Sequence, residues 1–112
     1  MEMEAKHYRT HELKLKADVP GARMWAVSLE RTQLTYFEVQ PNSRFEEHSH
    51  ESEQITMVLS GELFFEVNEG RVCVGEGEVI AIPANVPHAV FTGESPVRAV
   101  DAWSPVMDKY NT

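Results

Sequence analysis

Short apolar stretches separated by turn-forming residues dominate the chain. β-Branched and aromatic residues concentrate in eight segments: 24–29, 33–39, 54–59, 63–67, 71–74, 79–82, 88–92 and 97–103. Gly, Pro, Asn and Ser stand between these segments, as in Pro41-Asn42-Ser43. Because those residues favour turns and no long segment has helical periodicity, the pattern predicts an all-β domain, a sandwich or a barrel.

The two ends of the chain are its least strand-like parts. Residues 2–16 are the one stretch in which a helical turn could fit, and residues 104–112 are typical of a trailing arm. A chain of 112 residues is close to the commonest size of one domain. We therefore expect a single domain over 1–112, with an N-terminal arm or strand in 1–20 and a C-terminal arm in 104–112.

The strand predicted at 63–67 is apolar on both faces. Leu63, Phe65 and Val67 form one face by alternation, and Phe64 makes the other face apolar as well. A strand of this kind is covered on both sides. We therefore expect a second copy of the chain to cover the sheet, which would make the protein a homodimer.

Charge and composition limit the classes of partner that the chain can bind. The net charge is −8 and only ten Lys and Arg are scattered along the chain, which argues against nucleic acid. No apolar run approaches the ~18 residues of a membrane helix, and residues 1–16 lack the apolar stretch of a signal peptide. The single cysteine, Cys73, excludes an internal disulfide and fits a cytoplasmic protein; between two valines it is typical of a small buried residue. A small molecule is the expected partner.

Two histidines two residues apart are the first candidate for chemistry. In a strand, the side chains of His48 and His50 would emerge on one face and could reach one ion. Next to Glu46, Glu47 and Glu51, the pair alone would be an ordinary exposed segment. The spacing of the residues around the pair changes that interpretation.

The spacing resembles the two motifs of the cupin superfamily. The first motif runs Gly, five residues, His-x-His, three or four residues, Glu, six residues, Gly. Asn42, His48, His50, Gln54 and Gly61 stand at those positions here.

The second cupin motif runs Gly, five residues, Pro-x-Gly, two residues, His, three residues, Asn. Gly77, Pro83, Asn85, His88 and Thr92 stand at those positions. The resemblance covers 41–92, with both motifs in order, and implies a single-domain jelly-roll barrel of the double-stranded β-helix type. It also implies one divalent metal ion, bound by His48, His50, Gln54 and His88.

The departures from the motifs can be explained physically. Asn42 and Asn85 replace glycines, and asparagine is the residue that best tolerates left-handed backbone angles after glycine. Gln54 replaces a glutamate, so the donor set is neutral and the metal keeps its full charge as a Lewis acid. Glu53 is the competing ligand, but alternation places it on the opposite face. Three imidazoles and an amide oxygen suit Ni, Zn, Fe or Mn.

Residues 48–62 and 82–89 are similar to the pectin-degradation cupins, which are small dimeric proteins that linearise unsaturated uronates. That family uses a His, His, Gln, His metal set, and it carries Asp-x-Phe-Ser-Pro-x-Arg near the C-terminus. Asp101, Trp103 and Met107 stand at the first, third and last positions here. A methionine cannot pair with a carboxylate, so the resemblance supports the metal set better than the uronate substrate. Arg44 or Arg98 could supply a positive charge instead.

The resemblance implies that Asp101 is a general base beside the metal. Val97, Ala99, Asp101 and Trp103 share one face of their strand, so the acid is either a pocket base or a structural acceptor. Trp103 is either a pocket wall or part of the core.

Three functions follow from these residues. The leading hypothesis is a metal-dependent isomerase or lyase that acts on a small oxygen-rich molecule such as a sugar acid. The alternatives are a metal-dependent dioxygenase and a non-catalytic module that binds a small molecule or a metal.

Overall fold

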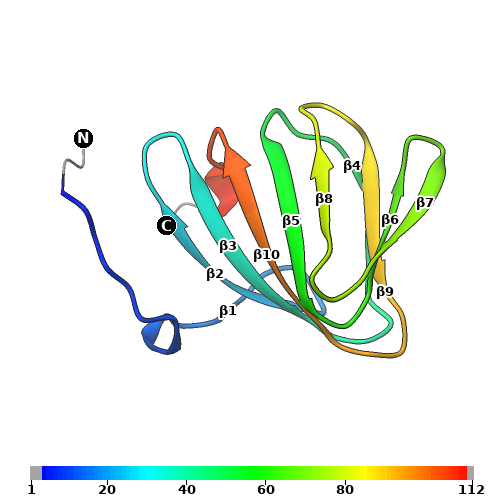
Figure 1. Ribbon diagram of the computed structural model, residues 1–112, viewed down its shortest axis with the longest axis horizontal. Coiled ribbons are helices and arrows are strands. Elements are labelled where there is room, and N and C mark those ends of the chain that lie inside the picture. Colours follow the sequence, from blue (N-terminus) through cyan, green and yellow to red (C-terminus); the bar gives the residue numbers. More distant parts are fainter. Residues whose placement is uncertain (1–3, 111–112) are drawn as a thin grey trace.

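The computed structural model describes residues 4–110, which form two antiparallel sheets that face each other (Figure 1). The strands are β1 (Lys16–Ala17), β2 (Ala22–Ser28), β3 (Gln33–Val39), β4 (Arg44–His48), β5 (Glu53–Ser60), β6 (Leu63–Val67), β7 (Gly70–Val74), β8 (Val79–Ile82), β9 (His88–Thr92) and β10 (Val97–Ser104). The six-stranded sheet has the order β1-β2-β3-β10-β5-β8, and the four-stranded sheet has the order β4-β9-β6-β7. The predicted all-β jelly-roll barrel is confirmed.

The strands agree closely with the sequence pattern. Four predicted segments coincide with β3, β6, β8 and β9, and the other four differ at their ends by one or two residues. β1 lies within 1–20, where an arm or strand was expected, whereas β4 was not predicted. β4 has the sequence RFEEH and only Phe45 is partly buried, so the strand carries no apolar alternation that could reveal it.

The inner face of the six-stranded sheet changes from apolar to mainly polar along its strands. At one end Phe37, Ala99 and Val58 lie side by side on β3, β10 and β5 and belong to the apolar core. Two residues further on, the same three strands present Thr35, Asp101 and Thr56, and the next row is Gln33, Trp103 and Gln54. All six of these residues are buried. The fold thus collects buried polar groups at one end of the barrel interior.

The two ends of the chain differ in how they pack. Residues 4–15 contain one 3-10 turn, η1 (Thr10–Glu12), and this segment runs outside the barrel (Figure 1). The C-terminal segment folds back instead: η2 (Asp108–Tyr110) buries Tyr110 against Phe37 and Trp103. Residues 1–3, 111 and 112 of the predicted terminal segments lie outside the described residues. Among residues 4–110, no helix is long and apolar enough to cross a membrane.

Two interpretations of β6 and β7 change. Phe64, whose outward position led us to expect a covering partner, stacks on Phe91 with ring centroids 5.1 Å apart, and Arg71 lies over Phe91. Part of its apolar surface is thus covered within the chain. The prediction that Cys73 is buried is wrong: the thiol is exposed on the edge strand β7, while alternation turns Val74 inward.

Candidate metal centre

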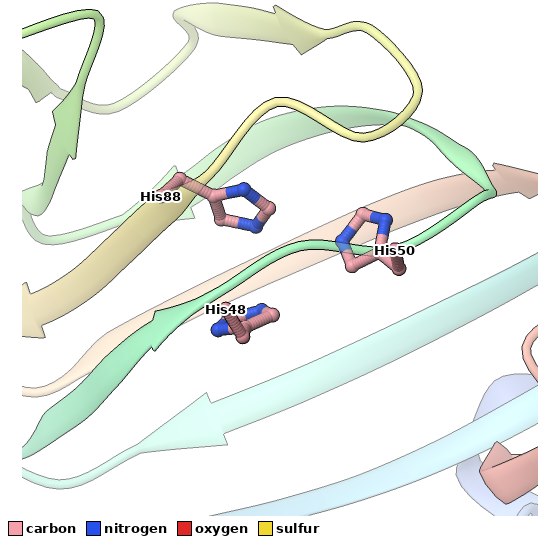
Figure 2. A group of neighbouring side chains, drawn as sticks. All are labelled: His48, His50 and His88. Atoms are coloured by element: carbon pink, nitrogen blue, oxygen red, sulfur yellow. The ribbon is translucent and has the colours of Figure 1, made fainter.

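Three histidines meet at one end of the barrel (Figure 2): His88 is buried, His50 half-buried and His48 exposed. His48 ends β4, His88 begins β9 and faces it across the sheet, and His50 follows in the connection to β5. One ring nitrogen of each lies within 4.8 Å of the others, and the ring centroids are 4.4 to 5.6 Å apart. His50 lies beyond the end of β4, so the two residues do not share a strand, but their side chains still converge.

A bulge in β4 turns His48 inward. Phe45 pairs with Val90 and His48 pairs with His88, so three steps along β4 match two along β9. Without the extra residue, alternation from the inward Phe45 would place Glu47 in the barrel and His48 outside. The bulge reverses this, and His48 lines the internal cavity.

The three imidazoles are held in one tautomer. The Nδ1 atoms of His48, His50 and His88 lie 2.9, 2.8 and 2.9 Å from the backbone carbonyls of residues 46, 52 and 86. A carbonyl only accepts, so each Nδ1 carries the proton and donates it. In the neutral imidazole this leaves the lone pair on Nε2, which is the form that binds a metal.

The amide of Gln54 completes the donor set. Its Oε1 lies 3.2 Å from Nε2 of His50, while its Nε2 donates to Oγ1 of Thr56 at 2.8 Å. With the His50 proton on Nδ1, two lone pairs face each other at that short distance. A cation between them would turn this repulsion into coordination, so the residues fit a divalent metal. Glu53, the competing ligand, is exposed, as alternation predicts.

The surroundings of His88 favour its neutral form. Burial lowers the pKa of His88, and His48 and His50 lower it further, whereas the hydrogen bond to Val86 acts in the opposite direction. A neutral imidazole is ready to bind a metal at neutral pH without losing a proton first.

The cluster opens into a cavity of about 420 Å³ between the sheets. Its polar lining consists of His48, Gln54 and Asp101 together with the charged residues Asp18, Arg44, Glu46 and Lys109. The rest of the lining is aromatic or aliphatic and includes Phe37, Phe45, Phe65, Trp103 and Tyr110. A cavity with a few convergent polar groups in apolar walls is the usual form of a small-molecule site.

Asp101 lies on the inner face of β10, between Thr35 of β3 and Thr56 of β5. Both hydroxyls donate to its carboxylate, Thr56 through a short contact and Thr35 at 3.4 Å. Burial raises the pKa of Asp101 to about 6, and the hydrogen bonds from Thr56, Thr35 and Gln54 act in the opposite direction. The carboxyl group is thus satisfied by side chains and also lines the cavity.

Trp103 lies between the apolar core and the cavity. It is 5% exposed within the apolar core and also lines the cavity. Its ring packs edge-on against the ring of His50, with the centroids 5.2 Å apart. Its indole N–H donates to the hydroxyl of Thr35 at 2.8 Å.

Sequence reasoning missed the residues around Asp101. Thr35 and Thr56 are inward-facing threonines in strands that were correctly predicted, so alternation could have identified them. Gln33 was missed too: it donates to the carbonyl of Met107 at 3.3 Å and accepts from its N–H at 3.0 Å, which fixes the C-terminal segment.

The predicted sources of positive charge lie in different places. Arg44 lines the cavity, but its guanidinium pairs with Glu46 and Glu66, each at 2.8 Å. Arg98 lies outside the barrel interior and donates to the hydroxyl of Tyr36 at 2.9 Å. Lys109, which the sequence did not single out, also lines the cavity. Met107 packs against the apolar core.

A two-sheet jelly roll with a histidine cluster at one end of its interior is the architecture of a cupin. Residues 35–103 match the Cupin domain family, and the chain belongs to that family. Acireductone dioxygenase 2 of Arabidopsis thaliana is 36% identical over 88 residues, which are 70% of this chain and 45% of the relative. The chain spans less than half the length of each acireductone dioxygenase that it matches.

Solved structures agree on the fold. KdgF from Halomonas sp. superposes with a TM-score of 0.87 over 95% of this chain and 98% of that chain, at 19% identity. The polyketide cyclase RemF from Streptomyces resistomycificus superposes with a TM-score of 0.79 over 91% and 80%, at 26% identity. The chain is therefore a cupin whose histidine cluster can hold one divalent metal ion.

Proposed function

We propose that the chain is a metal-dependent enzyme of isomerase or lyase type, which moves protons on a small oxygen-rich molecule. The observation that carries the proposal is that Asp101 lines the same cavity as His48 and Gln54. A bound molecule in this cavity meets both the metal ligands and a carboxylate, which are the parts needed for proton abstraction next to a carbonyl.

His48, His50, Gln54 and His88 would hold the metal, one Ni, Zn, Fe or Mn ion. When bound, the ion supplies Lewis acidity toward a carbonyl or hydroxyl oxygen of the substrate. Asp101 serves as the general base that takes a proton from a neighbouring carbon or hydroxyl. Trp103 forms one wall, and with the other aromatic side chains it keeps water from the reacting atoms.

The cavity lining supports a substrate with oxygen atoms at one end and a carbon skeleton against the aromatic wall. A sugar acid also needs a partner for its carboxylate, and Arg44 is already paired with two glutamates. Lys109 is available in the cavity lining, with its ammonium 4.9 Å from the centre of the Tyr110 ring. We assign it to the carboxylate, in place of the arginine that Met107 replaces.

The test is exchange of carbon-bound hydrogen. Metal-loaded protein is incubated in D₂O with a panel of uronates, keto-sugars and other hydroxyketones, and NMR follows deuterium uptake and isomer formation. The wild-type chain should exchange the hydrogen next to the carbonyl of at least one compound, and Asp101→Asn should lower that rate by about 10²- to 10⁴-fold with its metal retained. No exchange in any compound, or an Asp101→Asn variant as fast as the wild type, would overturn the assignment.

A dioxygenase is the second candidate, because the curated relatives are acireductone dioxygenases. Three imidazoles also suit Fe or Ni. An oxygen electrode on the same samples separates the two functions. Oxygen uptake that depends on an enediol substrate favours the dioxygenase, whereas exchange without oxygen uptake favours the isomerase or lyase.

The protein is also proposed to work as a homodimer, through the outer face of the six-stranded sheet. Leu34, Ile55, Met57 and Val79 are 42%, 52%, 39% and 56% exposed there. The register places them side by side across β3, β5 and β8, with Ala102 of β10 between Leu34 and Ile55. A continuous apolar sheet face of this kind is self-complementary and suits a second copy related by a two-fold axis.

A further inference from the structure

We infer that Thr56 is a positioning residue of the metal centre: its hydroxyl, committed to Asp101, makes Gln54 turn its carbonyl oxygen toward the histidines. The inference rests on the proposed metal site and adds a residue that does not touch the metal. Its basis is the direction of the two hydrogen bonds that link Gln54 to Asp101 through the hydroxyl of Thr56.

The direction follows from counting donors and acceptors. A threonine hydroxyl has one proton and can donate only once. Thr56 donates that proton to Oδ1 of Asp101. Toward Gln54 the same oxygen can therefore only accept, and it takes a hydrogen bond from Nε2 at 2.8 Å.

The fixed Nε2 determines where the rest of the amide points. Once Nε2 faces Thr56, Oε1 must lie on the other side, 3.2 Å from Nε2 of His50. If the amide were rotated by half a turn, Thr56 would have to donate to Gln54 and give up its charge-assisted bond to Asp101. An amide NH₂ would then face the lone pairs of the histidines and would repel a cation. The hydroxyl of Thr56 thus favours the amide orientation that can bind a metal, and the carboxylate of Asp101, which also interacts with the Gln54 amide, favours the same orientation.

A second hydrogen-bonded chain on the other side of Asp101 has the same polarity. The indole N–H of Trp103 donates to Thr35 at 2.8 Å, and Thr35 donates to Oδ2 of Asp101 at 3.4 Å. An indole N–H can only donate, so the direction of this chain has no alternative. Thr35 therefore provides a matched control: it is a buried threonine on the same carboxylate, but it does not contact Gln54.

The network also explains why residue 54 is an amide. A glutamate at this position would place a second carboxylate one hydroxyl away from Asp101, with a single Thr56 proton between two acceptors. Two buried carboxylates that close repel each other strongly. Gln54 instead supplies both an N–H for Thr56 and an oxygen for the metal. The amide of Gln54 and the carboxylate of Asp101 are thus coupled through the hydroxyl of Thr56.

The test measures the dissociation constant for Ni²⁺ alone, by competition with a chromophoric chelator at about pH 8, where the carboxylate is ionised. Thr56→Val should weaken binding by about 10-fold, within the range seen when partners of metal ligands are removed. Thr56→Ser keeps the hydroxyl and should bind within about 3-fold of the wild type, as should Thr35→Val.

A double-mutant cycle links the effect to the amide. If Thr56 acts through Gln54, the Thr56→Val change should add nothing to a Gln54→Ala background. Thermal unfolding of the metal-free variants checks that they fold, and Thr56→Ala replaces the valine variant if that one does not.

The outcomes distinguish the inference from the proposed metal site. Three results would each overturn the inference alone. The first is an equal loss of Ni²⁺ affinity in Thr56→Val and Thr35→Val, and the second is an unchanged affinity in Thr56→Val. The third is a further loss when Thr56→Val is added to Gln54→Ala. A wild-type chain that binds no Ni²⁺, Zn²⁺, Fe²⁺ or Mn²⁺ would overturn the metal site, and the inference with it.

Discussion

At Asp101, burial and hydrogen bonding act in opposite directions on the pKa of the carboxyl group. Its side chain is 7% exposed, and the loss of hydration outweighs the hydroxyl bonds that favour its charged form. The folded chain therefore binds a proton at Asp101 more readily than the unfolded chain does. A pKa raised by folding means that ionisation of this group destabilises the folded state.

This linkage predicts a pH-dependent effect of Asp101→Asn in the metal-free protein. Asparagine has nearly the same shape but does not ionise. The contribution of Asp101 to wild-type stability is complete below its ordinary pKa of 3.8 and is lost as the pH rises through about 6. From about pH 4 to about pH 7, the free energy of unfolding of the variant should rise relative to the wild type, by at most roughly 3 kcal/mol.

Urea unfolding in the presence of a chelator, repeated across that pH range, measures the difference. Asp108→Asn changes an exposed carboxyl group and serves as the control, with a difference expected to stay flat. A flat difference for Asp101→Asn as well would show that the carboxyl is not desolvated in the folded chain.

Individual site residues were predictable where spacing along the chain carried the information. The three histidines and Gln54 fall at fixed intervals in two short motifs, and the structure brings them together. The roles of Thr35 and Thr56 were not predictable in this way, because they arise from pairing of β10 with β3 and β5. Those strands are far apart in sequence, and only the register places both threonines on Asp101.

At the scale of elements, the turns were easier to predict than the charged strand. Asn42 and Asn85 have φ of 56° and 64°, so asparagine at the two glycine positions does adopt left-handed backbone angles, as predicted. β4 escaped prediction because its strand character comes from pairing with β9 and not from its own composition. Its bulge has no sequence signature either, although it decides that His48 faces the cavity.

The turn at Asn85 connects the two halves of the metal centre. Its backbone N–H donates to the carbonyl of His50 at 2.8 Å, three residues before His88 in the chain. Asn85→Val should destabilise the fold by about 1–2 kcal/mol, because a β-branched residue is strained at positive φ. It should also weaken Ni²⁺ binding, since His50 and His88 would lose their common anchor. Asn85→Gly adopts the same backbone angles without strain and should bind Ni²⁺ like the wild type.

Thermal unfolding and chelator competition on the two variants check this prediction. Asn42 provides the comparison, because its N–H bonds to Gly93 and not to a metal ligand. Asn42→Val should destabilise the fold by a similar amount without a specific loss of Ni²⁺ affinity. If both valine variants lose metal affinity equally, the Asn85 turn has no special link to the site.

At the scale of the whole molecule, the two sheets differ in what their outer faces expose. On the four-stranded sheet, Phe64 stacks on Phe91, and Arg71 lies over the Phe91 ring. The six-stranded sheet exposes Leu34, Ile55, Met57 and Val79, while its next row along β2, β3 and β10 carries charges of both signs. For a chain of net charge −8, an apolar face with a mixed-charge border is the surface on which two copies repel each other least.

Ile55→Lys should therefore separate the proposed dimer into single chains. Each copy would bring a lysine into the apolar interface without a counter-charge, and burying a charge costs far more than the lost apolar contact. Light scattering after size exclusion should give twice the chain mass of 12.7 kDa for the wild type and a single mass for the variant. Val72→Lys, which changes a 41% exposed valine on β7, should remain dimeric. A wild-type chain that elutes as a monomer, or a Val72→Lys variant that dissociates equally, would show that this sheet face is not the interface.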